Sequence, residues 1–377
     1  MQKLKVGIIC GGKSAEHEVS LQSAKNIYEA IDKEKFIPLL IGIEKNGRWI
    51  FGPQDRIGDF ILDSEDPAKI HLASGTCDVV LPPKSEGNLL MYRSRRVLES
   101  PPERKEPEAV HIDVFFPILH GPFGEDGTVQ GLLKLAEVPF VGPGVLGSAA
   151  GMDKDVMKRL LRDSGIPIGK FMVLRNWEPP PSFAEVSEKL GTPVFVKPCN
   201  MGSSVGINKV HDEESFRRAL KTAFVYDTKL ILEEHIRGRE IECSVLGNEA
   251  PRVSLPGEVR AHRDFYSYEA KYIDAAGAAL EIPAKLSPEQ IRTIQTLAVK
   301  TFRILECQGL SRVDFFLMED GAVLVNEINT LPGFTKISMY PKLWETSGIS
   351  YTELITTLIE LALARFETEK NLKTSYS

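Results

Sequence analysis

A set of polar side chains recurs at regular spacing in the stretch RVDFFLMEDGAVLVNEIN, residues 312–329. Asp320-Gly321 lies between two largely apolar runs, which is a strong signal for a β-hairpin with a two-residue turn. Such a turn predicts these cross-strand pairs: Glu319 with Ala322, Asp314 with Glu327, and Arg312 with Asn329. Because strand side chains alternate between faces, the last two pairs should share one face of the hairpin.

The chemistry of these side chains points to a divalent cation. Two carboxylates opposed at about 5 Å are destabilising unless positive charge lies between them. Asp314, Glu327 and the amide oxygen of Asn329 form a hard-oxygen set suited to Mg²⁺, and Arg312 adds positive charge beside it. The alternative is a solvated sheet face with an ordinary ion pair. The other face is largely apolar and supplies the core contact through Val313, Phe315, Leu317, Leu324 and Ile328.

Two further stretches carry side chains suited to a nucleotide. In FVKPCNMGSSVG, residues 195–206, Lys197 precedes a loop rich in Gly and Ser, whose N–H groups could cradle phosphate. In LILEEHIRGREIE, residues 230–242, Glu233 and Glu240 could accept hydrogen bonds from an adenine amino group and a ribose. Each has a plainer alternative, since Gly-Ser loops are commonly turns and acids at a strand end are commonly solvated.

The stretch GIICGGKS, Gly7 to Ser14, matches the phosphate-loop pattern G-x-x-x-x-G-K-[ST]. Such a loop must follow a strand, yet Leu4–Cys10 is itself the candidate strand, and Gly7 falls in its middle. A strand, a Gly11-Gly12 turn and a helix starting near Ser20 form one alternative. Another is a ligand-holding turn at the carboxyl end of a parallel strand.

The elements that must position these side chains differ between the two halves of the chain. Before residue 150, short apolar runs at 4–10, 36–43, 111–119 and 138–142 alternate with helical patterns, which predicts a parallel α/β sheet. Residues 99–109 should form a surface loop, and Gly52–Leu98 is not assigned.

After residue 150 the pattern becomes α+β. Strands are expected at 193–198, 230–236 and 241–247, and helices at 212–224 and 287–306. A final helix over 351–366 should close the C-terminal domain, and the polar segment 367–377 is expected to be a disordered tail.

Composition excludes several classes of protein. Of the 377 residues, 42% are hydrophobic and 26% charged, as in ordinary soluble domains. The net charge of −6 gives no support to binding of nucleic acid or a membrane surface. Five scattered cysteines without C-x-x-C spacing indicate reduced thiols in a cytoplasmic protein. No apolar run approaches the length of a membrane span, and no signal peptide is expected.

Taken together, the motifs resemble those of the D-alanine–D-alanine ligases, of the ATP-grasp superfamily. The resemblance runs from Leu4 to Phe366 and rests on GGKSAEHEVS, LHGPFGEDGTVQG, MDKDVMKRLL, FVKPCNMGSSVG, YSYEAKY, GLSRVDFF and NEINTLPGFT, in family order. It implies that GIICGGKS is the family's first strand and turn, and that the phosphate-loop match is a coincidence.

The resemblance implies an ATP-grasp fold, mixed α/β and α+β, preceded by a parallel α/β domain. The expected substrate-binding N-terminal domain is 1–150, and the central ATP-grasp subdomain is 151–236. The C-terminal subdomain is 237–366, with a mobile lid at 262–279, followed by the tail 367–377.

The resemblance also assigns roles to individual residues. ATP phosphates would be bound by Lys154, Lys197 and Lys271, and the adenosine by Glu233, His235, Ile236 and Glu240. Two Mg²⁺ ions, with Mn²⁺ possible, would be held by Asp314, Glu327 and Asn329. Arg312 and the N–H of Gly333 would stabilise the oxyanion.

The substrate side is implied in the same way. Glu16 would bind the ammonium of the first D-alanine, with His120 near its carboxylate. Ser203 and Tyr272 would complete a network with Glu16, and the carboxylate of the second D-alanine would meet Ser338 and Met339. Taken alone, His120 could end a strand, Ser203 could form a turn, and Tyr272 could be a packing aromatic.

The implied reaction forms a D-alanyl phosphate from ATP and D-alanine, which a second D-alanine attacks to give D-alanyl-D-alanine for peptidoglycan precursors. A homodimer is the family expectation, with no nucleic acid or membrane partner. A depsipeptide or other amino-acid ligase, a P-loop NTPase and a non-catalytic nucleotide-binding protein are the competing functions. The aromatic Tyr272 favours the dipeptide product over a depsipeptide.

Overall fold

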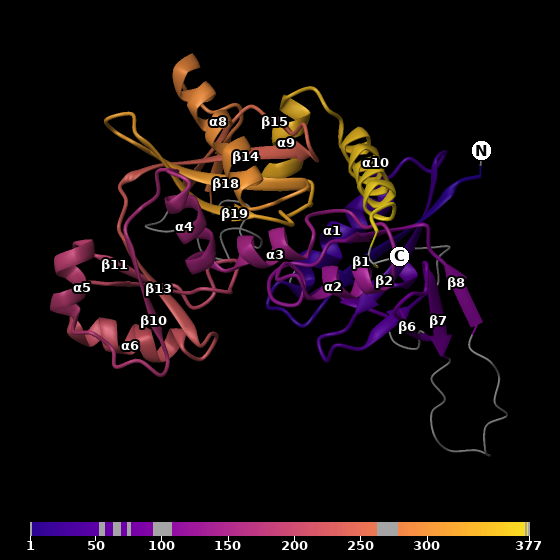
Figure 1. The fold of residues 1–377 in the computed structure, drawn as a ribbon, viewed down its shortest axis with the longest axis horizontal. Coiled ribbons are helices and arrows are strands. Elements are labelled where there is room, and N and C mark those ends of the chain that lie inside the picture. The colour runs from indigo at the N-terminus through magenta and orange to yellow at the C-terminus, as the bar shows by residue number, and fades with distance from the viewer. Residues whose placement is uncertain are drawn as a thin grey trace.

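A computed structural model describes the chain at residues 2–52, 57–62, 69–73, 77–92, 108–261, 278–373 and 375. Its main sheets follow one another along the sequence, with seven, four and six strands. Figure 1 shows the N-terminal sheet at the right, the four-stranded sheet at the left and the six-stranded sheet at the top.

The N-terminal sheet has the order β8-β7-β6-β3-β2-β1-β9. Its parallel part consists of β1 (Leu4–Gly11), β2 (Phe36–Ile43) and β9 (Val114–Pro117). An antiparallel part adds β3 (Trp49–Phe51), β6 (Cys77–Val80), β7 (Asn88–Tyr92) and β8 (Glu108–His111). The predicted parallel sheet is therefore confirmed at its centre, and part of the unassigned segment extends it as a mixed sheet.

Three helices and a small ribbon accompany this sheet. The helices are α1 (His17–Ala30), α2 (Thr128–Leu135) and α3 (Val145–Met152), and the ribbon comprises η1 (Ile57–Asp59), β4 (Ile61–Leu62) and β5 (His71–Leu72). The strand predicted at 138–142 is reduced to an isolated bridge between Phe140 and Phe115.

Gly7 lies inside β1, between Leu39 of β2 and Phe115 of β9. A Cβ at this position would come within 2.9 Å of the Ile112 side chain, so close packing accounts for the glycine. The chain turns only at Gly11 and Gly12, both with positive φ, and α1 begins at His17, earlier than predicted. The phosphate-loop interpretation fails because its first glycine belongs to the strand.

The four-stranded sheet is antiparallel, in the order β10-β13-β11-β12. Its strands are β10 (Phe171–Arg175), β11 (Val194–Pro198), β12 (Asn208–Val210) and β13 (Lys229–Glu234), accompanied by α4 (Lys154–Asp163), α5 (Phe183–Leu190) and α6 (Glu213–Ala223). Capping boxes start two of these helices, at Ser182 for α5 and Asp212 for α6.

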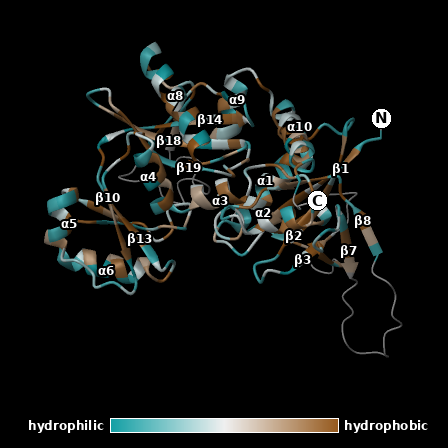
Figure 2. Ribbon diagram, in the orientation of Figure 1, coloured by the Kyte–Doolittle hydropathy of each residue, from teal (hydrophilic) through white to brown (hydrophobic). Residues whose placement is uncertain are grey.

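The six-stranded sheet contains β14 (Gly238–Gly247), β15 (Arg252–Val253), β16 (Gly257–Ala261), β17 (Ala278–Glu281), β18 (Gly309–Met318) and β19 (Val323–Asn329). Its helices are α8 (Pro288–Ile304), α9 (Met339–Thr346) and α10 (Tyr351–Glu369). Figure 2 shows hydrophobic residues along the strands and hydrophilic ones on outward helix surfaces such as that of α8.

The predicted hairpin forms from β18 and β19, but its turn is one residue longer than expected. The N–H of Met318 donates to the carbonyl of Ala322, so Glu319 does not pair with Ala322. The register shifts at a β-bulge between Asp314 and Phe315, opposite which Asn326 is the extra residue.

The longer turn shifts the pairing register by one residue, and the bulge shifts it back. Arg312 still lies opposite Asn329, and Asp314 opposite Glu327, as predicted. Between the bulge and the turn, each residue of β19 lies on the opposite face from the one predicted. The prediction that Leu324 lies on the buried face is therefore wrong. Val323 and Val325 are buried there instead.

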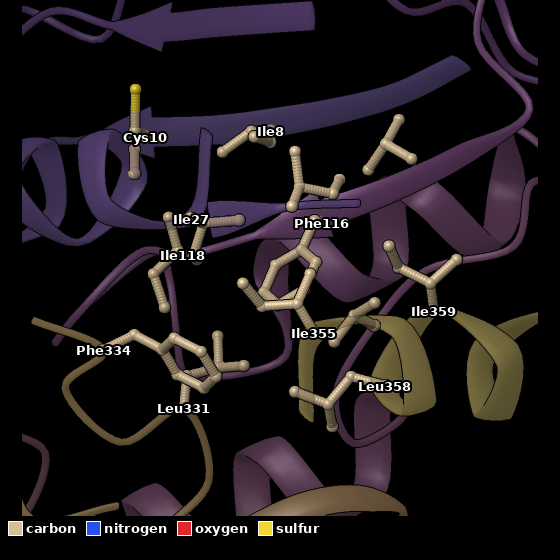
Figure 3. Packing of buried hydrophobic residues seen from close by; sticks show 14 of the residues in the cluster. Ile8, Cys10, Ile27, Phe116, Ile118, Leu331, Phe334, Ile355, Leu358 and Ile359 are labelled. Carbon is tan, nitrogen blue, oxygen red and sulfur yellow. The ribbon is translucent and has the colours of Figure 1, made fainter. Parts of the chain in front are cut away.

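The helix α10 does not simply close the C-terminal domain, as predicted, because it also packs on the N-terminal sheet. Figure 3 shows Ile355 and Leu358 of α10 close to Phe116 of β9 and to Leu331 and Phe334 of the loop after β19. The helix continues to Glu369, so the first residues of the predicted disordered tail are helical.

Candidate active site

A cavity of about 280 Å³ is lined by residues from all three main sheets and their loops. Its walls are formed by the loop after β1, the Gly/Ser loop after β11, the end of β13, and the strands β14, β18 and β19. Every predicted site residue that the structure describes lines it: Glu16, His120, Lys154, Lys197, Ser203, Glu233, His235, Ile236, Glu240, Arg312, Asp314, Glu327, Asn329, Gly333, Ser338 and Met339. Lys271, Tyr272 and most of the predicted lid lie outside the described residues.

Arg312 is held by carboxylates from two strands. Its Nε and Nη2 donate to Asp314 at 2.7 and 2.8 Å, a two-point contact that fixes the plane of the guanidinium. The Glu242 carboxylate of β14 also lies 2.7 Å from Nε. Arg312 therefore presents a fixed positive charge to the cavity.

The residues expected to hold a metal ion fit a hard divalent cation. Asp314 accepts hydrogen bonds from Arg312 and from Asn329 at 2.9 Å, while Lys154 Nζ lies 3.7 Å from Glu327. Arg312 and Lys154 balance the charge of these carboxylates, and the two carboxylates with the Asn329 amide oxygen are the kind of hard-oxygen donors that Mg²⁺ prefers. Within the described residues, no three Asp, Glu, His or Cys side chains form a metal cluster by themselves.

Glu16 and Ser203 meet across the cavity although they are far apart in sequence. Ser203 Oγ donates a hydrogen bond to Glu16 Oε1. A Cβ on Gly202 would come within 2.8 Å of Glu16 Oε2, so a side chain at this position would displace the Glu16 carboxylate. The contact joins the loop after β1 to the Gly/Ser loop after β11.

His120 and Glu125 hold the loop after β19 by bonding the carbonyl and the N–H of one residue, Leu331. His120 Nδ1 lies 3.0 Å from the Leu331 carbonyl, and Glu125 accepts the Leu331 N–H at 3.1 Å. Glu125 also accepts the N–H of Gly121 at 2.7 Å. This loop carries Gly333, so the N-terminal unit positions a predicted oxyanion donor.

Burial controls the charge of both side chains. It lowers the pKa of His120 to about 4, so the imidazole is neutral at pH 7 and can act there only as a hydrogen-bonding group. Burial, aided by the nearby charge of Glu16, raises the pKa of Glu125 to about 8.

Among the residues predicted to bind a nucleotide, the carboxylate of Glu233 lies between the ammonium groups of Lys158 and Lys197, each at 2.7 Å. Burial alone would raise the pKa of Glu233, but the two lysines outweigh it and hold the pKa well below its usual range. Lys154, at the start of α4, donates to the Met201 carbonyl at 2.8 Å and so faces the Gly/Ser loop.

The start of α9 also borders the cavity, through Ser338 and Met339. Ser338 precedes this helix, and its Oγ accepts the Thr335 N–H at 3.0 Å without capping the helix. Free N–H groups at a helix start attract a carboxylate. Gly333 leaves room for Ser338, since a Cβ there would lie 3.0 Å from Ser338 Oγ.

Sequence reasoning missed three titratable residues at the predicted site: Lys158, Glu125 and Glu242. Glu125 belongs to LHGPFGEDGTVQG and Lys158 to MDKDVMKRLL, so the motifs contained both. Glu242 follows Glu240 by two residues, which places both on one face of β14.

Comparison with known families decides the class of protein. The family model described as D-ala D-ala ligase N-terminus matches residues 5–143, and the D-ala D-ala ligase C-terminus model matches 160–360. The chain belongs to the D-alanine–D-alanine ligase family.

Individual members of this ligase family match over the whole length. The D-alanine–D-alanine ligase of Oceanobacillus iheyensis is 51% identical, over 100% of this chain and 99% of its own. The solved D-alanine–D-alanine ligase of Coxiella burnetii is 38% identical with a TM-score of 0.83, over 98% of this chain and 97% of that one.

A third ligase resembles the chain as well. The solved D-Ala:D-Ser ligase VanG of Enterococcus faecalis is 35% identical with a TM-score of 0.80, over 96% of this chain and 100% of its own. The structural matches confirm the ATP-grasp fold expected from the motifs, with its preceding α/β domain. Among the described residues, no helix is both long and apolar enough to cross a membrane.

Proposed function

We propose that this protein uses ATP to join two molecules of D-alanine into D-alanyl-D-alanine, for the synthesis of peptidoglycan precursors. The observation that carries the proposal is the single cavity in which all described site residues meet. Lysines and Glu233, Arg312 and the metal-type oxygens, and Glu16 with the start of α9 all line this cavity. Membership of the ligase family supports the same activity.

The proposed first step is phosphoryl transfer. A carboxylate oxygen of the first D-alanine attacks the γ-phosphorus of ATP, the bond to ADP breaks, and D-alanyl phosphate forms. Glu16 holds the substrate ammonium, and Lys154, Lys197 and Lys271 bind phosphate oxygens. Glu233, His235, Ile236 and Glu240 bind the adenosine.

The second step forms the amide. The amine of the second D-alanine attacks the acyl carbon and loses a proton, and inorganic phosphate leaves from the tetrahedral intermediate. Arg312 and the Gly333 N–H stabilise the oxyanion charge that develops there. Ser338 and Met339 receive the carboxylate of the second substrate, while His120, Ser203 and Tyr272 orient the first.

Asp314, Glu327 and Asn329 would hold the magnesium, for which two ions are expected and Mn²⁺ is a possible substitute. Bound there, the metal would neutralise charge on the transferring phosphoryl group.

The identity of the second substrate depends on the rim of the cavity near Ile337 and Met339. Because one structural relative is a D-Ala:D-Ser ligase, the test must include D-serine as well as D-lactate. The proposed preference for D-alanine rests on Tyr272.

We also propose that the protein is cytoplasmic and homodimeric. Its five cysteines are free thiols, four of them buried, which suits a reducing compartment. Light scattering after size-exclusion chromatography measures the mass, with about 84 kDa expected for two chains of 41.9 kDa.

The deciding experiment measures phosphate release from ATP and Mg²⁺ with D-alanine, L-alanine, or D-alanine mixed with D-serine or D-lactate, and identifies products by mass. Phosphate stoichiometric with D-alanyl-D-alanine, and none with L-alanine, is the expected result. A mixed product formed in preference to the dipeptide would contradict the assigned second substrate. ATP hydrolysis without any D-amino acid would contradict the ligase mechanism.

A further inference from the structure

The Glu233 carboxylate is shared by two lysines that reach it from different elements. Glu233 lies on β13, Lys197 on the neighbouring strand β11, and Lys158 on the helix α4. Lys158 Nζ is 2.7 Å from Oε1, and Lys197 Nζ is 2.7 Å from Oε2. Each oxygen of the carboxylate therefore has its own ammonium partner.

The two lysines differ in their access to the cavity. The Lys197 side chain is 16% exposed and lines the cavity, whereas the Lys158 side chain is 3% exposed and does not line it. A ligand in the cavity can therefore draw Lys197 away from Glu233. Lys158 cannot reach that ligand and stays with the carboxylate.

The loss of one partner matters because the pair is buried. A buried carboxylate that loses its only cation either takes up a proton or holds on to the cation. Either result would harm nucleotide binding, because Lys197 is the proposed phosphate ligand and Glu233 the proposed acceptor for the adenine amino group. A second cation that stays beside Glu233 lets Lys197 move to the ligand while the carboxylate remains ionised.

We propose that Lys158 is a positioning residue that keeps Glu233 ionised and correctly oriented while Lys197 turns to the ATP phosphates. Lys158 thereby determines both the affinity for ATP and the selectivity for adenine over guanine. Adenine offers an amino donor where guanine offers a carbonyl acceptor, so an ionised Glu233 attracts the first and repels the second. This inference rests on the proposed ATP site.

The central test is Lys158→Met, which preserves length and removes charge. We expect the dissociation constant of a non-hydrolysable ATP analogue, measured by calorimetry, to rise roughly 10- to 100-fold. The KM for ATP should rise with it, kcat at saturating ATP should fall by less, and the preference for ATP over GTP should shrink about 10-fold.

Two further variants separate positioning from folding. Lys158→Arg keeps the charge and should recover most of the affinity. In a Glu233→Gln background Lys158 has no carboxylate to position. Adding Lys158→Met there should raise the dissociation constant by less than about 2-fold further. Lys229→Met is the matched control, because Lys229 is a partly buried lysine of the same unit that pairs with Asp153 and Asp155 and does not contact Glu233.

Equal nucleotide affinity and selectivity in wild type and a folded Lys158→Met variant would overturn the inference. So would additive effects of Lys158→Met and Glu233→Gln, which would show that Lys158 acts elsewhere. If the wild-type protein itself binds no adenine nucleotide, it is the proposed function that fails. Measuring the wild type first therefore distinguishes the two failures.

Discussion

At the residue scale, the site depends on charged side chains that hold one another in fixed positions. Asp314 binds the guanidinium of Arg312 at two points, and Glu242 lies against the same nitrogen from the next strand. The guanidinium does not have to reorganise when the reaction occurs, because it already faces the cavity. Such fixed donors are the usual source of oxyanion stabilisation.

Replacing Arg312 with lysine should lower kcat about 10²- to 10³-fold, because a flexible ammonium cannot reproduce the planar two-point contact. Phosphate release at saturating substrates measures the effect. The matched control is Arg239→Lys, since Arg239 makes a similar two-point contact with Glu258 on the same sheet but does not line the cavity. Equal losses in both variants would contradict a catalytic role for Arg312.

His120 should make the protein less stable in mild acid. Its folded pKa, about 4, lies below the ordinary value of 6.5, so the unfolded chain binds the proton more readily. The stabilisation is present above pH 6.5 and is lost as the pH falls towards 4. Between pH 7 and pH 5 the loss is about 2 kcal/mol.

Urea unfolding of wild type and His120→Gln at both pH values isolates this contribution, because other titrating groups, Glu125 included, are common to both proteins. The acid-dependent loss should be about 2 kcal/mol smaller in the variant. An identical pH dependence in the two proteins would show that His120 does not titrate in this way.

At the element scale, the hairpin of β18 and β19 shows how a turn and a bulge together determine register. Gly321 ends the turn with φ +87°, a left-handed conformation that side chains disfavour. The bulge at Asn326 then restores the pairing of Asp314 with Glu327. The site geometry therefore depends on both irregularities.

Gly321→Ala should destabilise the protein by about 1 kcal/mol, through backbone strain alone, because a Cβ there meets no atom within 4 Å. Gly131→Ala is the opposite case: Gly131 lies within α2, has no positive φ, and also has open space around it. It should stabilise by about 0.5–1 kcal/mol. Chemical denaturation measures both, and the same sign for both would refute the conformational explanation.

At the scale of the whole molecule, the C-terminal helix holds the N-terminal sheet and the six-stranded sheet together. Arg365 of α10 is buried, donates to the carbonyls of Gly142 and Phe140 at 2.5 and 2.8 Å, and stacks on the Phe140 ring. The same helix packs against the loop that carries Gly333 (Figure 3). The site lies between these units, so its geometry depends on their docking.

Arg365→Met should lower the free energy of unfolding by about 3 kcal/mol, because two buried carbonyls lose a charged donor. Lys370→Met, at the exposed residue that follows the same helix, should change it by less than about 0.5 kcal/mol. Thermal unfolding followed by circular dichroism compares the two. Similar melting temperatures for Arg365→Met and wild type would contradict the proposed docking role.

The sequence by itself determined the local chemistry and most of the elements. Alternation along two strands placed Arg312, Asp314, Glu327 and Asn329 on one face, and the family motifs supplied the remaining site residues. The N-terminal parallel strands and the helices were also predictable, because their apolar periodicity is a property of neighbouring residues.

Only the tertiary structure decided which side chains support the site. The roles of Lys158, Glu125 and Glu242 arise from burial beside charges on other elements, and no local pattern encodes burial across distant segments. The same holds for α10, whose amphipathic pattern showed that it would pack but not against which sheet. Periodicity shows which face of one element is apolar, whereas the element against which that face packs depends on the free energy of the complete fold.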